Sequence, residues 1–259
     1  MADKALIDAH SQPTGKMSNQ TRLNFFASAP ESCSYLPDRK AVSAFANPHA
    51  DMDKQTYNIL IQHGFRRSGG YVYRPHCPGC AECISVRVPV RRHQPSRNEK
   101  RVLRLNADIA ATGIKGQYRR EHFELYQRYI SGRHGDGGMA NPTQADYHRF
   151  LICDWADTVF IEFRLREVLV AVAVSDITSS GLSAMYTFFD PDYANRSLGH
   201  FAILQQIEQA RLRGLEYLYL GYWIKNCNKM RYKNRYKPLE GFINDRWRDI
   251  TANPLAGAS

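Results

Sequence analysis

Between residues 21 and 97 the hydrophobic positions come in short runs, separated by glycine, proline, cysteine and arginine. These runs predict a helix over Asp53–His63 and strands over Tyr71–Arg74 and Ile84–Val90. Pro95-Ser96 then interrupts the pattern. Residues 1–20 are polar and mixed in charge, so we expect a loose leader there and a small Cys- and Arg-rich α+β domain over 21–97.

A second unit is predicted over residues 98–259. Apolar residues recur at helical spacing over Tyr118–Ser131 and predict a helix. The glycine-rich run over 135–138 predicts a flexible loop. Asn141-Pro142 predicts the start of another helix, with asparagine as the N-cap and proline in the first turn.

The pattern then changes to strands. Thr158–Phe163 and Val168–Ser175 are β-branched and apolar, and the two residues Arg166-Glu167 between them predict a hairpin. Ala184–Phe189 predicts a third strand, which the turn residues Asp190-Pro191-Asp192 end.

A long helix is predicted over Leu198–Arg213, with Gly214 just beyond its end. Leu215–Leu220 then predicts a short buried strand. A strand, a helix and a further strand in this order predict a parallel crossover. The order resembles the core of the GCN5-related N-acetyltransferase fold, so we expect a mixed α/β protein with an acetyltransferase-like domain behind the smaller N-terminal domain.

The charge of the chain favours a polyanionic partner. Its formal net charge is +10, which is typical of proteins that bind nucleic acid, although a merely basic enzyme remains an alternative. No apolar run of about 18 residues predicts a membrane span, and the N-terminus has no apolar signal core. We therefore expect a cytoplasmic protein with reduced cysteines and no membrane partner.

The loop before the long helix is a candidate anion site, because backbone N–H groups at a helix start attract negative charge. The alternative is an ordinary serine-capped helix start. The residues of this candidate anion site are Arg196, Ser197, Leu198, Gly199 and His200.

Asp190 and Tyr222 are the candidate catalytic residues. Asp190 can act as a base, or it can simply stabilise the Asp-Pro-Asp turn. Tyr222 can donate a hydrogen bond to a developing oxyanion, or it can cap the core.

The segment 225–237 contains six basic residues, two tyrosines and no acidic residue. Basic residues interleaved with aromatic ones indicate contacts with an RNA backbone. A solvated charged face is the alternative, but such a face usually includes acidic residues. The basic residues are Lys225, Lys229, Arg231, Lys233, Arg235 and Lys237.

Cys77, Cys80 and Cys83 have C-x-x-C-x-x-C spacing, and Cys33 is a possible fourth ligand. Four thiolates suit zinc or an iron–sulfur cluster, whereas the alternative is a tight turn with small, partly buried cysteines. No motif of a zinc protease, a P-loop enzyme, an α/β-hydrolase or a dinucleotide enzyme occurs.

Several segments together resemble bacterial aspartate/glutamate leucyltransferases, the leucyl-tRNA–protein transferases related to eukaryotic arginyl-tRNA–protein transferases. The resemblance covers nearly the whole chain after about residue 20. The segments are Cys33-Ser-Tyr-Leu-Pro37, Phe65-Arg-Arg-Ser68, Tyr73-Arg-Pro75, Ser197-Leu-Gly199, Leu218-Tyr-Leu-Gly-Tyr-Trp-Ile224, Lys229-Met230 and Tyr236-Lys-Pro-Leu-Glu240.

The resemblance implies transfer of leucine from leucyl-tRNA to proteins with N-terminal Asp or Glu, which marks them for degradation by the N-degron pathway. Asp190 is then expected to deprotonate or orient the acceptor amine, and Tyr222 to polarise the ester. No ATP or metal is required. In eukaryotic relatives N-terminal cysteines can hold an iron–sulfur cluster, but Cys33 here lacks a C-x-x-C partner.

The acidic side chain of the acceptor requires a cation, and a guanidinium group binds a carboxylate with two hydrogen bonds. The candidates in the N-terminal domain are Arg66, Arg67, Arg74 and Arg87. Two other functions remain open: an acyl-CoA-dependent N-acyltransferase and a non-catalytic RNA-binding protein. The basic segment argues against the first function, and Asp190 with the anion loop argues against the second.

Overall fold

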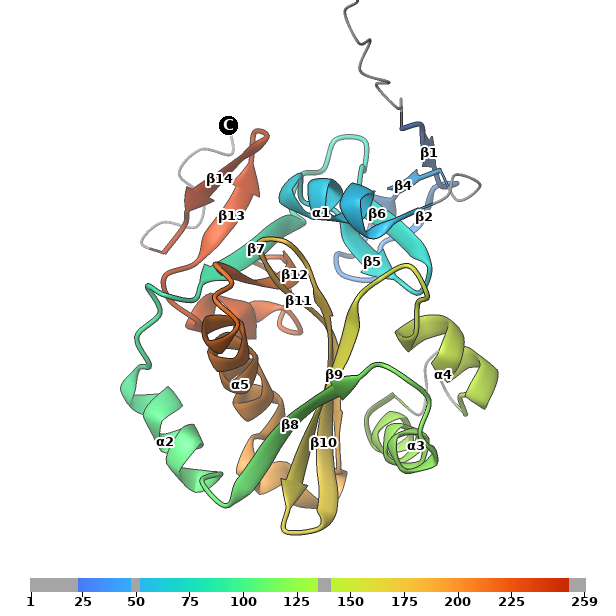
Figure 1. Ribbon diagram of the computed structural model, residues 1–259. Coiled ribbons are helices and arrows are strands. Elements are labelled where there is room, and N and C mark those ends of the chain that lie inside the picture. Colours follow the sequence, from blue (N-terminus) through green and yellow to red (C-terminus); the bar gives the residue numbers. More distant parts are fainter. Residues whose placement is uncertain (1–22, 48–51, 135–140, 252–259) are drawn as a thin grey trace, which may run out of the picture.

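The computed structural model describes residues 23–47, 52–134 and 141–251. The predicted leader over 1–20 and the predicted loop over 135–138 lie outside these ranges. The described chain is a mixed α/β protein built on one large sheet, with a smaller sheet packed beside it (Figure 1). Among these residues, no helix has the length and apolar character that a membrane span needs.

The predicted hairpin lies near one edge of an eight-stranded mixed sheet, with only β8 outside it. β9 (Thr158–Leu165) and β10 (Val168–Ile177) pair antiparallel across the predicted turn. β11 (Gly181–Phe189) pairs with β10 on one side. β8 (Ile109–Lys115), a strand that the hydrophobic pattern did not reveal, pairs with β9 on the other side and forms an edge.

The parallel crossover is confirmed. β11 leads through a short 3₁₀ helix, η1 (Pro191–Arg196), into α5 (Leu198–Leu212), and β12 (Tyr217–Trp223) returns parallel to β11. Gly214 lies at the predicted position after α5 and has a φ of +71°. Glycine adopts this left-handed conformation without steric cost, so the chain can leave the helix and enter β12 at once.

The sheet continues beyond β12 with strands from both ends of the chain. β7 (Ile84–Pro89) pairs with β12, and β13 (Glu240–Ile243) and β14 (Arg246–Asp249) extend the sheet to its other edge. β7 precedes residue 97, yet it is a central strand of the large sheet. The division of the chain into two domains at residue 97 remains a prediction. β7 comes before this residue in the sequence but pairs with strands that come after it.

Helices cover both faces of the large sheet (Figure 1). α2 (Arg97–Leu105) and α5 bury their apolar residues against one face, and α3 (Arg120–His134) and α4 (Gln144–Leu151) against the other. Alternate residues of β9 enter the two cores, since successive strand residues point to opposite faces. Phe160 contributes to the core under α3, and Ile161 to the core under α5.

The start of α4 differs from the prediction, and α2 was not predicted at all. The N-cap of α4 is Thr143, whose hydroxyl accepts from the backbone N–H of Asp146, so the start predicted at Asn141-Pro142 is wrong by two residues. α2 begins with a capping box between Ser96 and Glu99. That S-x-x-E pattern is visible in the sequence, but the many basic residues of α2 obscured its helical character.

The smaller sheet comes from the N-terminal part of the chain. Its strand order is β1-β4-β6-β5, and the predicted helix α1 (Lys54–Gln62) packs beside it with Asp53 as its N-cap. A separate pair, β2 and β3, joins the first two of these strands. The strands are β1 (Phe25–Ala27), β2 (Glu31–Ser32), β3 (Lys40–Ala41), β4 (Ser43–Ala46), β5 (Arg66–Ser68) and β6 (Tyr71–Pro75).

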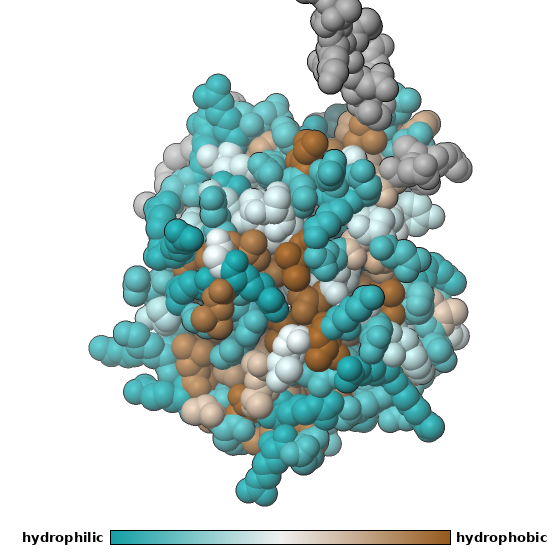
Figure 2. Space-filling view, viewed as in Figure 1, coloured by the Kyte–Doolittle hydropathy of each residue, from teal (hydrophilic) through white to brown (hydrophobic). Residues whose placement is uncertain are grey.

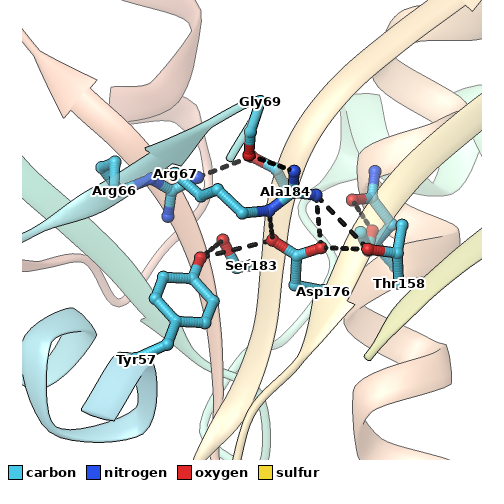
Figure 3. A network of polar contacts seen from close by, with 10 residues as sticks. Tyr57, Arg66, Arg67, Gly69, Thr158, Asp176, Ser183 and Ala184 are labelled. Carbon is cyan, nitrogen blue, oxygen red and sulfur yellow. Dashed lines mark hydrogen bonds and ion pairs between the residues drawn. The ribbon is translucent and has the colours of Figure 1, made fainter. Parts of the chain in front are cut away.

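A buried ion pair fixes the small sheet to the large one (Figure 3). Arg67 of β5 donates two hydrogen bonds of 2.6 and 2.7 Å to Asp176 of β10, and both side chains are fully buried. Thr158 and Tyr57 also donate to the Asp176 carboxylate, at 2.8 and 3.4 Å. Because each charge has its partner, the network tolerates burial and sets the position of β5.

We predict that Asp176→Ala lowers the free energy of unfolding by about 3–5 kcal/mol, because it leaves the Arg67 guanidinium buried without its partner. Lys54→Ala is the control, since its ion pair with Asp157 joins the same two parts of the chain but is about half exposed, with side chains 50% and 48% accessible. Its loss is expected to cost less than about 1 kcal/mol. Urea denaturation measures both, and equal losses would contradict the account.

Candidate active site

The parallel strands β11 and β12 separate towards their carboxyl ends. They pair only from Gly181–Ser183 to Tyr217–Tyr219, whereas β11 continues to Phe189 and β12 to Trp223. The two strands therefore form a wedge. Ligands of open α/β sheets bind at the carboxyl ends of parallel strands, where such a crevice opens. The wedge is the candidate site.

Gly221 forms the bend on the β12 side of the wedge. Its φ is +81°, and the pairing of β12 with β7 shifts register between Tyr219 and Gly221. A Cβ at this position would lie 3.6 Å from the Lys233 Nζ and 3.7 Å from the Arg66 Nε. The strand thus bends where two cationic side chains approach its backbone.

Arg66 and Lys233 each bind a carbonyl of one strand of the wedge. Arg66 comes from β5 and donates to the carbonyl of Ala184 in β11 at 2.7 Å (Figure 3). Lys233 comes from the short 3₁₀ helix η2 (Arg231–Arg235) and donates to the carbonyl of Tyr222 in β12 at 2.5 Å. Both residues are only 6% exposed. The wedge therefore contains two buried cations from distant parts of the chain.

Burial and, to a lesser extent, the charge of Arg66 together lower the pKa of Lys233 to about 7. The thiols of Cys227 and Cys83 oppose this shift only in part. Lys233 had been expected on an RNA-binding surface. Its burial excludes it from that surface and corrects the sequence-based prediction for this residue.

The rest of the basic segment divides into two groups. Lys237 is half-buried and donates to the Asn234 side chain and the Thr251 carbonyl, so it supports the C-terminal strands rather than facing solvent. Burial lowers its pKa as well. The exposed members remain free to contact a polyanion, and they are Lys225, Lys229, Arg231 and Arg235.

Asp190 ends β11 as predicted, and its side chain is buried. Its carboxylate accepts from Arg128 of α3 at 2.9 Å and from the backbone N–H of Asp192 at 3.1 Å. A carboxylate with these partners is suited to holding a positively charged or hydrogen-bonding group in place. The role of proton acceptor has no support from these contacts.

The loop at the start of α5 differs in part from the predicted anion site. Ser197 is the N-cap residue, but its φ is 54° and its side chain makes no capping hydrogen bond. Arg196 forms a bidentate ion pair with Asp108, at 2.7 and 3.0 Å, so its charge is already neutralised. Leu198 is buried in the core. The predicted anion binding therefore rests on backbone groups of this turn and not on Arg196.

The last two residues of this loop pack closely. A Cβ on Gly199 would lie 3.2 Å from the Phe189 ring, so glycine permits the close approach of α5 to β11. His200 is half-buried and packs edge-on against Tyr236 at 5.2 Å. Burial lowers the pKa of His200, and its Nε2 has no hydrogen-bond partner among the described residues.

Tyr222 does not have the freedom that the predicted catalytic role requires. Its hydroxyl donates to the carbonyls of Gly64 and Tyr73, at 3.1 and 3.0 Å, and burial raises its pKa well above the usual value. These bonds attach β12 to the small sheet. The contacts argue for a structural role and against polarisation of an ester.

Three of the four arginines that were candidates for the acceptor carboxylate have other partners. Arg67 pairs with Asp176, and Arg87 pairs with Glu240 at 2.8 Å beneath the ring of Tyr217. Arg74 lies over the Phe65 ring and is 38% exposed on the small sheet. Arg66 alone of the four lies in the wedge.

The four cysteines of the predicted metal site are free thiols of intermediate burial. Burial, together with Cys77, Cys33 and Cys80, raises the pKa of the Cys83 thiol to about 12. Among the described residues, no three His, Cys, Asp or Glu side chains are placed to share a metal ion.

The chain is thus a mixed α/β protein in which two buried basic side chains, Arg66 and Lys233, lie in the wedge between β11 and β12. Figure 2 shows apolar residues gathered near the middle of one face with hydrophilic residues around them, as is typical of binding sites. Two family models match the chain. They are described as arginine-tRNA-protein transferase, N terminus, over residues 31–101, and arginine-tRNA-protein transferase, C terminus, over residues 121–243. The chain belongs to the arginine-tRNA-protein transferase family.

Curated relatives match over nearly the whole chain. The aspartate/glutamate leucyltransferases of Pseudomonas putida (strain GB-1) and Pseudomonas fluorescens (strain SBW25) are 49% and 50% identical to it over 237 residues, which is 92% of this chain and all of each relative. Among solved structures, L-PGS from Bacillus licheniformis aligns with a TM-score of 0.41 and 10% identity, covering 66% of this chain and 51% of that one. The family assignment rests on the first two relatives and the family models.

We predict that Lys233 makes stability depend on pH. Between pH 7 and about 10 the unfolded chain holds a proton on this lysine that the folded chain has released, so the free energy of unfolding rises with pH, by up to about 1 kcal/mol per unit. Lys233→Met removes this contribution. The difference in unfolding free energy between the two proteins should therefore change from pH 7 to pH 9, and a constant difference would refute the assignment.

Proposed function

We propose that this protein transfers leucine from leucyl-tRNA to the N-terminus of proteins that begin with Asp or Glu. The relatives that this chain matches over their whole length are named for this activity. The observation that carries the proposal is the wedge, where buried cations suited to an acidic residue lie beside an exposed basic segment suited to RNA. The product is expected to enter the N-degron pathway in the cytoplasm.

We further propose that the larger domain has the fold of the GCN5-related N-acetyltransferases. A strand, a crossover helix and a second strand that splays from the first are typical of GCN5-related N-acetyltransferases, in which the loop before the helix binds the donor. We assign residues 98–259 to such a domain and 21–97 to the smaller domain beside it. β7 enters the large sheet from the smaller domain, which ties the two together.

The donor is proposed to enter at the end of the wedge nearest α5. The backbone of Ser197–His200 would hold the 3′-terminal adenosine, and the exposed basic residues of the 225–237 segment would contact the acceptor stem. Leucyl-tRNA also carries a free α-ammonium group on its leucine. Asp190, a buried carboxylate at the end of β11, would orient that group in exchange for its present partner Arg128.

The reaction is the aminolysis of an ester. The neutral α-amine of the acceptor attacks the ester carbonyl, a C–N bond forms, and the bond from carbon to the ribose oxygen breaks. One proton passes from the nitrogen to the ribose hydroxyl that leaves. An N-terminal amine has a pKa of about 8, so a substantial fraction is neutral without a dedicated base. Orientation of the two substrates can supply most of the acceleration.

The proposal predicts that Asp190→Asn slows leucine transfer roughly 100-fold, because the donor is no longer held in one orientation. Asp192→Asn is the matched control, since this carboxylate is exposed and only two residues away. Single-turnover transfer with saturating leucyl-tRNA measures both, and urea denaturation checks that both proteins are folded. Equal rates for the two variants would remove Asp190 from the site.

The activity itself is tested with the pure protein, a panel of charged radiolabelled tRNAs, and peptides that differ only in their first residue. We expect incorporation only with leucyl-tRNA and an acidic first residue. Transfer from acetyl-CoA would instead identify an acyl-CoA-dependent acyltransferase. Binding of tRNA without any transfer would identify an RNA-binding protein.

A further inference from the structure

Arg66 and Lys233 are two buried cations with no carboxylate partner in the described part of the chain. Both are 6% exposed, and both lie against the backbone of Gly221. Among the described residues, their hydrogen-bond acceptors are the carbonyls of Ala184 and Tyr222 and the sulfur of Met230, and the Lys233 Nζ also lies 5.7 Å from the centre of the Tyr232 ring. The Nη1 of Arg66 is buried and has no hydrogen-bond partner in this part of the chain.

The chain treats its other buried arginines differently. Arg67 has Asp176 at 2.6 Å, and Arg87 has Glu240 at 2.8 Å. A buried charge is costly unless it is paired, and two like charges side by side add their mutual repulsion. The two buried arginines that support the fold thus each have a carboxylate partner. In the described part of the chain, no carboxylate lies between Arg66 and Lys233. An anionic group from outside the chain would complete this site.

We propose that Arg66 and Lys233 together bind the side-chain carboxylate of the acceptor's acidic first residue. This inference rests on the proposed function and adds the residues that set its specificity. The guanidinium edge of Arg66 with its free Nη1 supplies one donor. Lys233 supplies the other as an ammonium group, because a carboxylate bound beside it favours the protonated form of the lysine. A side chain that ends in a neutral amide would leave both charges unpaired, so Asn and Gln would be rejected.

A carboxylate suits this position better than an RNA phosphate. The two cations are almost completely buried, and the rings of Tyr73 and Tyr222 pack against each other with their centroids 6.0 Å apart. A single carboxylate side chain needs less room at such a buried position than a phosphodiester, which carries a nucleoside on each side. Cations accessible to phosphates are present on the surface of the same segment, at Lys225, Lys229, Arg231 and Arg235.

The distance along β11 is consistent with one amino acid from each substrate. Arg66 binds the carbonyl of Ala184, and Asp190 ends the same strand six residues later. At roughly 3.3 Å per residue this separation is about 20 Å in an extended strand. The leucyl group held by Asp190 and an acceptor residue held by Arg66 and Lys233 fit between these ends. The ester and the attacking amine would meet in the middle of the wedge.

The test measures kcat/KM for leucine transfer to four peptides that begin with Asp, Glu, Asn or Gln and are otherwise identical. The variant is Lys233→Met, which removes the charge and shortens the unbranched side chain by only one heavy atom. Lys237→Met is the matched control, because it makes the same change in the same segment at a lysine bound to Asn234 and Thr251. The dissociation constant of leucyl-tRNA is measured for all three proteins.

We expect Lys233→Met to lower kcat/KM for the Asp and Glu peptides by roughly 30-fold or more, and so to reduce the preference for Asp over Asn. Leucyl-tRNA affinity should remain unchanged, and Lys237→Met should keep the full preference. Lys233→Arg, which restores the charge, should recover part of the lost activity.

Three outcomes would overturn the inference or its basis. If Lys233→Met keeps the full preference for Asp over Asn, the proposed carboxylate site is refuted, but the proposed leucine transfer is not. Weaker leucyl-tRNA binding with an unchanged preference would assign the two cations to an RNA phosphate. Absence of leucine transfer by the wild-type protein would refute the proposed function itself. If Lys233→Met does not fold, calorimetry of the wild-type protein decides, because an Asp peptide must then bind more tightly than its Asn counterpart.

Discussion

The position of the N-terminal sheet depends on the ion pair between Arg67 and Asp176. This pair is fully buried and is completed by Thr158, Tyr57 and the carbonyl of Gly69. Its two ends belong to different sheets, so the geometry of one sheet relative to the other follows from a single set of directed bonds. Since Arg66 is the next residue on β5, the same pair directs its side chain to the opposite side of the strand and into the wedge.

The wedge itself follows from an interrupted ladder. β11 and β12 are parallel for only three residue pairs, after which Gly221 bends β12 away at a φ that other residues rarely adopt. Strand carbonyls that no longer face a neighbouring strand require donors. Arg66 and Lys233 provide them, and they bring two positive charges with them. The separation of the strands thus creates both the space for substrates and the charge that selects them.

Much of the fold was predictable from the hydrophobic pattern, because its signals are local. The β9–β10 hairpin, α5 with Gly214 at its end, and the parallel return of β12 follow from alternation, helical spacing and turn residues. β8 and β14 escaped because their pattern of burial does not alternate clearly, and α2 because charged residues dominate it. The place of β7 in the large sheet depends on pairing with residues more than a hundred positions away, which no local signal encodes.

The site was less predictable for the same reason. A sequence shows which residues are charged, but not which of them have found a partner. Arg67 and Arg87 resemble Arg66 in the sequence, yet both are neutralised by carboxylates from distant strands. Lys233 belongs to a run of surface lysines and arginines and is nevertheless buried. The sequence predicted that arginines bind the acidic acceptor. Only the tertiary contacts show that Arg66 and Lys233 are the two buried cations without a carboxylate partner in the described part of the chain.

A crystal structure of the protein with an Asp-initiated peptide and a non-hydrolysable amide analogue of leucyl-adenosine tests the account most directly. We expect the aspartate carboxylate to lie within hydrogen-bonding distance of Arg66 and Lys233, with the peptide amine facing the leucyl carbonyl between β11 and β12. A peptide carboxylate bound to Arg74 or to the exposed residues of the 225–237 segment, with the space beside Gly221 empty, would contradict it.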